Sequence, residues 1–107
     1  MNLSAEMEIP QKRGIVGEIL SFRVEDDGQF IVEIMLVNTK KLLPSTVCVI
    51  ATIYNEAYDM IKKIEAKHPI KLAGSYMSGD SRVVVRLFSH LDEEERSKAC
   101  ILEVRLV

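Results

Sequence analysis

The sequence contains no tryptophan, and its aromatic residues are limited to three tyrosines and three phenylalanines. Cysteine is also scarce, and neither Cys48 nor Cys100 belongs to a CxxC pair or a Cys/His cluster. A disulfide or a metal site therefore has little support, and we expect two buried, reduced thiols. The phosphate-binding patterns GxxxxGK[ST] and GxGxxG are absent as well, so no cofactor is expected.

Long apolar runs are also missing from the chain. No stretch approaches the roughly 20 apolar residues that a membrane-spanning helix requires. The first ten residues include Glu6 and Glu8, where a secretory signal peptide would carry basic residues followed by an apolar segment. These two absences predict a cytoplasmic protein without a membrane partner.

Neither sign of charge dominates, since 14 lysines and arginines stand against 16 aspartates and glutamates, for a net charge of −2. No overall positive field therefore marks the chain as a nucleic-acid-binding protein. A mildly acidic protein can still carry one basic groove, and the basic residues do occur in local pairs. These pairs are Lys12 and Arg13, Lys40 and Lys41, Lys62 and Lys63, and Arg82 and Arg86.

Length and composition indicate one globular domain covering residues 1–107. Apolar residues make up 48% of the chain and charged residues 28%, whereas disordered segments combine low hydrophobicity with high net charge. A chain of this length can bury one core without disulfides or metals. Residues 1–11 have weak periodicity, and we expect them to form an irregular N-terminal arm.

Alternating and continuous apolar segments predict five strands, at residues 15–24, 30–37, 47–54, 70–77 and 82–88. Phe30 belongs to an apolar alternating set of the second strand, so it is expected in the core. The run from Glu25 to Gly28 predicts a tight turn between the first two strands. Glu18 interrupts the alternation of the first strand, which indicates a bend or β-bulge near Gly17.

One helix is predicted between Asn55 and Lys67. Asn55 can cap its N-terminus, and Pro69 follows at the point where it would end. Apolar residues recur at the spacing of one helix face. This stripe consists of Ala57, Met60, Ile61 and Ile64.

The end of the chain predicts an extra strand. Residues 92–98 are expected to form a charged turn or short helix, and residues 99–107 then alternate in polarity. This strand would either extend the sheet or pair with a second subunit, because an open apolar edge favours association. We therefore expect a homodimer or a higher oligomer.

Three strands, a helix and two strands are the element order of the OB-fold, a five-stranded Greek-key barrel. On this order, the sequence predicts a mainly β OB-fold with one helix between strands 3 and 4 and an extra C-terminal strand. Over about residues 14–91 the chain also resembles the bacterial single-stranded DNA-binding proteins, including their primosomal PriB branch. The similarity lies in Gly14-Ile15-Val16-Gly17-Glu18-Ile19, Val47-Cys48-Val49-Ile50-Ala51 and Ile70-Lys71-Leu72-Ala73-Gly74-Ser75-Tyr76-Met77.

The resemblance implies a non-enzymatic protein that binds single-stranded DNA, or RNA, with little sequence preference. Its setting would be replication, recombination or mobile-element transfer, with a replication protein as a further partner. Binding needs positive charge for phosphates and flat rings for bases. The candidate residues are Arg82, Arg86 and Phe88 on the fifth strand, Tyr76 across the hairpin, and Lys40, Lys41 and Tyr54 beside strands two and three.

Several of these candidates also have a purely structural interpretation. Tyr76 fits a core position, Tyr54 could pack on the helix, and Lys40 and Lys41 could form a solvated loop. At the level of function the alternative is a protein-interaction subunit that does not bind nucleic acid, which the net negative charge and the lack of tryptophan favour. An enzyme is not expected, because no group of residues with distinct catalytic roles converges around either histidine.

Overall fold

The structure is a computed structural model, and it describes residues 4–7, 11, 12, 14–39, 44–73 and 81–107. The described part consists of strands and one short helix, α1 (Glu93–Lys98), so the prediction of a mainly β protein is confirmed. The strands are β1 (Ser4–Met7), β2 (Gln11–Lys12), β3 (Ile15–Val24), β4 (Gln29–Asn38), β5 (Ser45–Val47), β6 (Val49–Tyr54), β7 (Met60–Glu65), β8 (Ile70–Leu72), β9 (Ser81–His90) and β10 (Ile101–Leu106). Among the described residues, no helix is long and apolar enough to cross a membrane.

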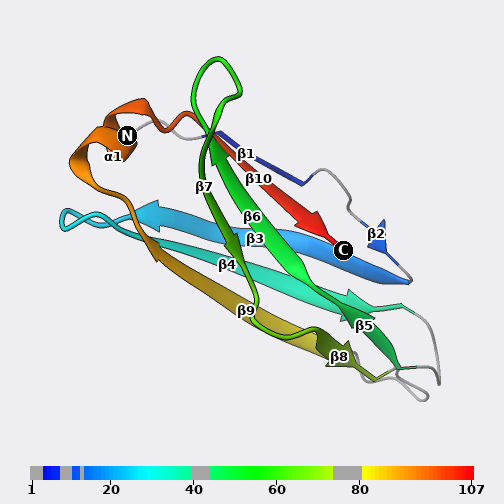
Figure 1. The fold of residues 1–107 in the computed structure, drawn as a ribbon. Helices are drawn as coiled ribbons and strands as arrows, with labels where there is room; N and C mark the ends of the chain where they lie inside the picture. Colours follow the sequence, from blue (N-terminus) through cyan, green and yellow to red (C-terminus); the bar gives the residue numbers. More distant parts are fainter. Residues whose placement is uncertain (1–3, 8–10, 13, 40–43, 74–80) are drawn as a thin grey trace.

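Two four-stranded sheets form the body of the molecule (Figure 1). We call them the β9 sheet, with the order β2-β3-β4-β9, and the β10 sheet, with the order β1-β10-β6-β7. At their margins β1 lies beside β3, and β7 lies beside β9, without strand pairing. The described strands therefore form separate sheets rather than one closed barrel. A small third sheet, β5-β8, continues the β6–β7 hairpin.

The core lies between the two large sheets. The inner face of β4 contributes four fully buried side chains, which are Phe30, Val32, Ile34 and Leu36. From the β10 sheet, Ala51, Ile53, Leu102 and Val104 are equally buried. The alternation that placed Phe30 in the core is therefore confirmed, because successive strand residues point to opposite faces of a sheet.

The first hairpin forms as predicted. Residues 25–28 connect β3 to β4, and Gly28 adopts a φ of +91° that favours glycine. The predicted bulge is also present, although it lies at Leu20 rather than near Gly17. Ile19 pairs with Ile34 and Ser21 pairs with Glu33, so Leu20 is an extra residue and is 47% exposed. Before the bulge the odd-numbered residues of β3 point toward the core, and after it the even-numbered residues do. This change explains the broken alternation of the strand.

The predicted helix at residues 55–67 is wrong, because this segment forms a turn and strand β7. Asn55 Oδ1 accepts backbone hydrogen bonds from Ala57 and Asp59, both at 2.9 Å, and so fixes a turn rather than a helix cap. Beyond it, Ile64 pairs with Ala51 of β6 and is 9% exposed. The apolar residues of this segment also fit the spacing of a helix face, but pairing with β6, the preceding strand of the hairpin, overrides that pattern.

Other boundaries differ from the sequence prediction. The N-terminal arm is partly regular, since β1 pairs in parallel with β10 and β2 pairs with β3. The third strand is interrupted at Cys48, where β5 ends and β6 begins. Both Cys48 and Cys100 are free thiols, but they are half-buried rather than buried. Of the predicted strand 70–77 the structure describes β8, and residues 74–77 lie outside the described part.

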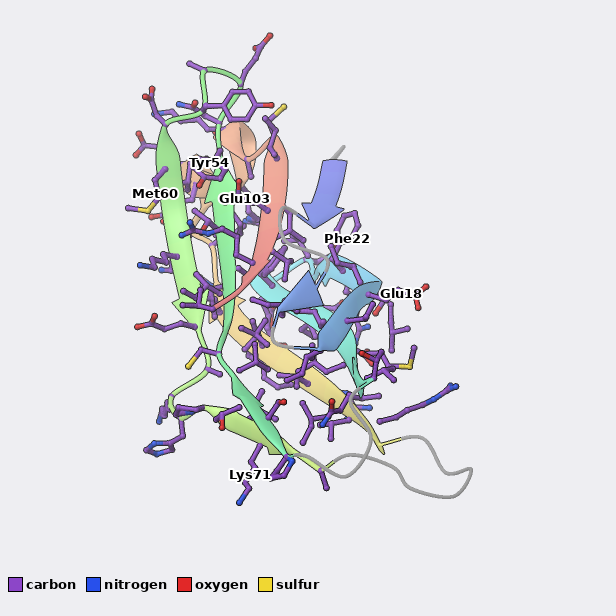
Figure 2. The ribbon with its side chains drawn as sticks, turned by 90° about the vertical axis from the view of Figure 1, so that its right-hand side faces the viewer. Glu18, Phe22, Tyr54, Met60, Lys71 and Glu103 are labelled. Carbon is purple, nitrogen blue, oxygen red and sulfur yellow. The ribbon has the colours of Figure 1, made fainter. Side chains whose placement is uncertain are left out.

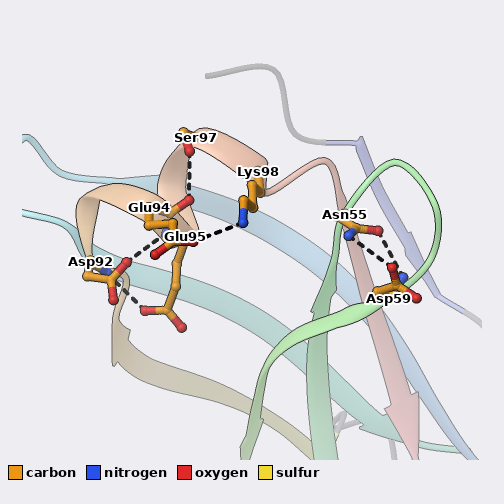
Figure 3. A network of polar contacts seen from close by, with 7 residues as sticks. All are labelled: Asn55, Asp59, Asp92, Glu94, Glu95, Ser97 and Lys98. Atoms are coloured by element: carbon orange, nitrogen blue, oxygen red, sulfur yellow. Dashed lines mark hydrogen bonds and ion pairs between the residues drawn. The ribbon is translucent and has the colours of Figure 1, made fainter.

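The C-terminal strand extends the sheet, which was one of its two predicted roles. β10 lies between β1 and β6 and pairs with both, so it is no sheet edge. The short helix before it is confirmed as α1. Asp92 and Glu95 form a capping box there, with Asp92 Oδ1 accepting from the Glu95 backbone at 2.7 Å (Figure 3).

Candidate nucleic-acid interface

Strand β9 carries the main group of predicted binding residues. Val83, Val85 and Leu87 point toward the core, so the side chains between them point away from it. These outward residues are Arg82, Val84, Arg86 and Phe88, and all four are exposed. The expectation that Arg82, Arg86 and Phe88 share one face is confirmed.

The outward residues of β3 and β4 complete this surface, which we call the outer face. Strand register places Met35 and Glu18 beside Val84, and Ile31 and Arg23 beside Phe88. Figure 2 shows Glu18 at the edge of the molecule, directed away from the core. Apolar and charged side chains therefore lie together on a surface three strands wide.

Glu33 controls the electrostatics of the outer face. Its Oε2 lies 3.4 Å from Arg86 Nε, and its Oε1 lies 3.7 Å from the Arg23 guanidinium. The Glu33 side chain is 22% exposed, whereas the Arg86 side chain is 61% exposed. A half-buried carboxylate thus faces two arginines, and it offsets part of the positive charge that a phosphate would meet.

A hollow of about 450 Å³ runs beside β9, between its free side and β7. Apolar side chains line most of it, Lys67 and Arg86 contribute positive charge, and Glu65 contributes negative charge. The apolar lining residues are Ile64, Ala66, Ile70, Val83, Val84, Val85, Leu87 and Phe88. The hollow therefore adjoins the outer face along one strand.

Tyr54 lies on the other sheet and takes no part in the outer face. Its hydroxyl donates to Glu103 Oε1 at 3.1 Å, and Figure 2 shows both side chains together, far from Lys71. Partial burial raises the pKa of Tyr54, and the hydrogen bond and negative charge of Glu103 raise it further. The structure thus separates Tyr54 from Arg82, Arg86 and Phe88. Lys40, Lys41 and Tyr76 lie outside the described residues.

Sequence reasoning missed a second exposed aromatic residue, Tyr58, at the tip of the β6–β7 hairpin. Its side chain is 64% exposed, its φ is +64°, and its ring lies 6.0 Å from that of Tyr54. Met60 beside it is 63% exposed. The available signal was Asn55 followed by Asp59, a pair typical of a turn, and Figure 3 shows these two side chains in contact.

The structure places His90 at the end of β9 and His68 at a bend between β7 and β8. His90 Nε2 lies 2.9 Å from the backbone oxygen of Asp27, so it ties the first turn to the end of β9. His68 is exposed beside Pro69. Across the described ranges, no group of three or more His, Cys, Asp or Glu side chains is placed to hold a metal ion.

Comparisons with known proteins identify no relative of this chain: no protein-family model, no curated protein and no solved structure matches it. Its function therefore has to be argued from the outer face itself.

Proposed function

We propose that this protein is a non-enzymatic, cytoplasmic binding module whose outer face binds single-stranded nucleic acid, DNA in the first place, with little sequence preference. The observation that carries the proposal is the exposed row of Arg82, Arg86 and Phe88 on β9. Positive charge and a flat ring on one strand are what a nucleotide strand needs for its phosphates and bases.

In this proposal, the arginines bind phosphates and Phe88 stacks on a base. Stacking contributes about 1–3 kcal/mol per base and does not depend on base identity. Phe88 is 55% exposed, so its ring is available to a ligand without a rearrangement of the core. Glu33 weakens the contact with phosphates, which predicts modest affinity rather than the tight coating of a general single-strand-binding protein.

We also propose that the two-sheet arrangement is a partly open variant of the OB-fold. The two sheets approach each other at both margins, where β1 lies beside β3 and β7 lies beside β9. The OB-fold is itself a partly open Greek-key barrel. In this variant the β6–β7 hairpin would take the position of the usual helix.

The experiment is a fluorescence-anisotropy titration of a labelled single strand of about 30 nucleotides and of its duplex, at low and moderate salt. We expect binding to the single strand, weakening as salt rises. Replacing Arg82 and Arg86 by alanine should reduce the salt slope by about 1.4, since each lost contact with a single strand removes about 0.7. The control variant K62A/K63A removes the same charge from β7. Equal affinity of wild type and R82A/R86A would contradict the site.

A protein-interaction subunit remains the second candidate, and the apolar side chains of the outer face favour it. Val16, Leu20 and Val84 are 37%, 47% and 49% exposed, and apolar side chains on one face are a feature of protein-interaction surfaces. A replication protein is the partner suggested by the sequence resemblance. Absence of single-strand binding even at low salt would make this the better proposal.

A further inference from the structure

The margin between β7 and β9 leaves part of the core open to solvent. These two strands lie beside each other without pairing, and β8 lies close to β9 as well. Val83 and Val85 point toward the core, yet both are only half-buried. Their partners on β4, Leu36 and Ile34, are fully buried. The hollow of about 450 Å³ therefore gives solvent access to side chains of the inner sheet face.

The shape of the hollow suits an extended apolar chain. One wall follows β9 from Val83 to Phe88, and the other consists of residues 64–67 and Ile70. A strand segment of this length extends over roughly 17–20 Å, so the hollow is long rather than round. Its volume lies in the range of small-molecule sites, which are lined mainly by apolar side chains. Because β7 and β8 already form the opposite wall, we expect a small molecule here rather than a further strand.

The charged residues of the hollow favour an anion. Lys67 and Arg86 supply two positive charges to the lining, and Glu65 supplies one negative charge. Arg86 is shared with Glu33, at 3.4 Å, whereas Lys67 forms no ion pair with any side chain that the structure describes. Lys67 is also exposed, so its ammonium group can bind a ligand without a rearrangement of the core.

We propose that this hollow binds an amphipathic anion, namely an unbranched aliphatic chain that ends in a carboxylate. The chain lies along β9 against the half-buried side chains of the inner face, and burial of both apolar surfaces drives binding. Lys67 binds the carboxylate, with Arg86 as the second cation of the hollow, and charge-assisted hydrogen bonds give the preference for an anion. This site does not rest on nucleic-acid binding, although Arg86 and Phe88 belong to both the hollow and the outer face.

The first test titrates the isotope-labelled full chain with decanoate, below the concentration at which micelles form, and follows the backbone amide signals by NMR. We expect shifts at residues 64–67 and 83–88, with a Kd on the order of 0.1–1 mM, because an open hollow buries only part of its ligand. Decyltrimethylammonium carries the same chain with the opposite charge and should bind about five-fold more weakly. Equal binding of the two probes, shifts centred elsewhere, or no saturation by ~5 mM would overturn the proposal.

The second test changes the charges of the hollow. K67A should weaken decanoate binding by about three- to five-fold and should not weaken decyltrimethylammonium binding. K63A is the matched control, because it removes the same charge from β7 at a residue outside the hollow. E65Q removes the carboxylate of the hollow and should tighten decanoate binding. Equal losses for K67A and K63A would show an effect of net charge alone and would refute the role of Lys67.

The third test fills the hollow. Ala66 is half-buried in its wall, so A66L places a larger side chain in the space of the ligand. We expect roughly a ten-fold loss of decanoate binding, since overlapping atoms exclude the chain. A57L adds the same side chain to the exposed hairpin tip and is the control. Urea unfolding checks that both variants fold, and K67A, on an exposed residue, keeps the site testable if A66L does not.

Undiminished decanoate binding by a folded A66L variant would contradict a ligand in this hollow. These titrations contain no nucleic acid, so failure of single-strand binding leaves their results unaffected.

Discussion

Glu33 lies directly opposite Arg86 on the β4–β9 ladder, and its Oε2 is 3.4 Å from Arg86 Nε. Surface ion pairs of this kind contribute at most about 1 kcal/mol. The Glu33–Arg86 pair can nevertheless weaken the binding of a phosphate, because the Glu33 carboxylate competes with phosphate for the Arg86 guanidinium. The pair therefore links the local packing of the sheet to the proposed binding of nucleic acid.

We expect E33Q to bind single-stranded DNA more tightly, by up to about five-fold, since the competing charge is worth up to about 1 kcal/mol. Anisotropy titrations at low salt measure this gain. E18Q is the matched control, because it removes the same charge from β3 on the same face. Equal gains for both variants would show a general effect of net charge rather than release of Arg86.

Tyr58 should destabilise the hairpin tip through its backbone, because its φ of +64° favours glycine or asparagine. Comparison of Y58G with Y58A isolates this effect, since both variants lose the ring contact with Tyr54. We expect Y58G to be more stable than Y58A by about 1 kcal/mol, measured by urea unfolding. If residue 58 had a negative φ, Y58A would be more stable than Y58G, and that result would contradict the observed geometry.

Local patterns predicted most of the strands correctly. Three features depend only on residues close in sequence, and the sequence alone therefore predicts them. They are the alternation of Phe30 to Leu36, the turn at Gly28 and the outward row on β9. The bulge was also visible as broken alternation, although the pattern did not fix its exact position. Period-two patterns are therefore reliable wherever one sheet face is buried.

The errors arise where pairing between strands decides the structure. Ile61 and Ile64 suit a helix face as well as a strand, and the ladder with β6 selects the strand. Likewise, nothing near Arg86 in the sequence reveals that Glu33, on another strand, partly neutralises it. Sequence order also does not show which sheet each strand joins, so it did not reveal that Tyr54 and Arg86 lie on different sheets.

G28A should destabilise the protein, because the new Cβ would overlap the carbonyl oxygen of Leu91 and the φ of +91° disfavours any side chain. We expect a loss of at least about 1–2 kcal/mol in the free energy of unfolding. D27A in the same turn removes only the hydrogen bond from the Gln29 backbone to Asp27 Oδ1 and should cost less. A neutral G28A variant would show that this turn can move away from β9.

Tyr54 should make stability depend on alkaline pH. Its pKa is raised above 10.0, first because the phenol is partly buried and then because Glu103 accepts its hydrogen bond and repels the phenolate. A group with a raised pKa stabilises the folded state below its unfolded pKa, and this stabilisation is lost as pH rises through the folded pKa. Wild type should therefore lose stability above about pH 10, the unperturbed value for tyrosine.

Replacement of Tyr54 by phenylalanine removes this dependence. We expect Y54F to lose about 1 kcal/mol near neutral pH, the usual net value of one hydrogen bond, and to show a smaller decline above pH 10 than wild type. Urea unfolding at pH 7, 9 and ~10.5 measures both effects, and the last pH lies just above the unperturbed pKa of tyrosine. Y58F is the matched control, since it removes a hydroxyl from the exposed ring 6.0 Å away. If Y54F and wild type decline in parallel, the Tyr54–Glu103 contact does not govern the alkaline limit of stability.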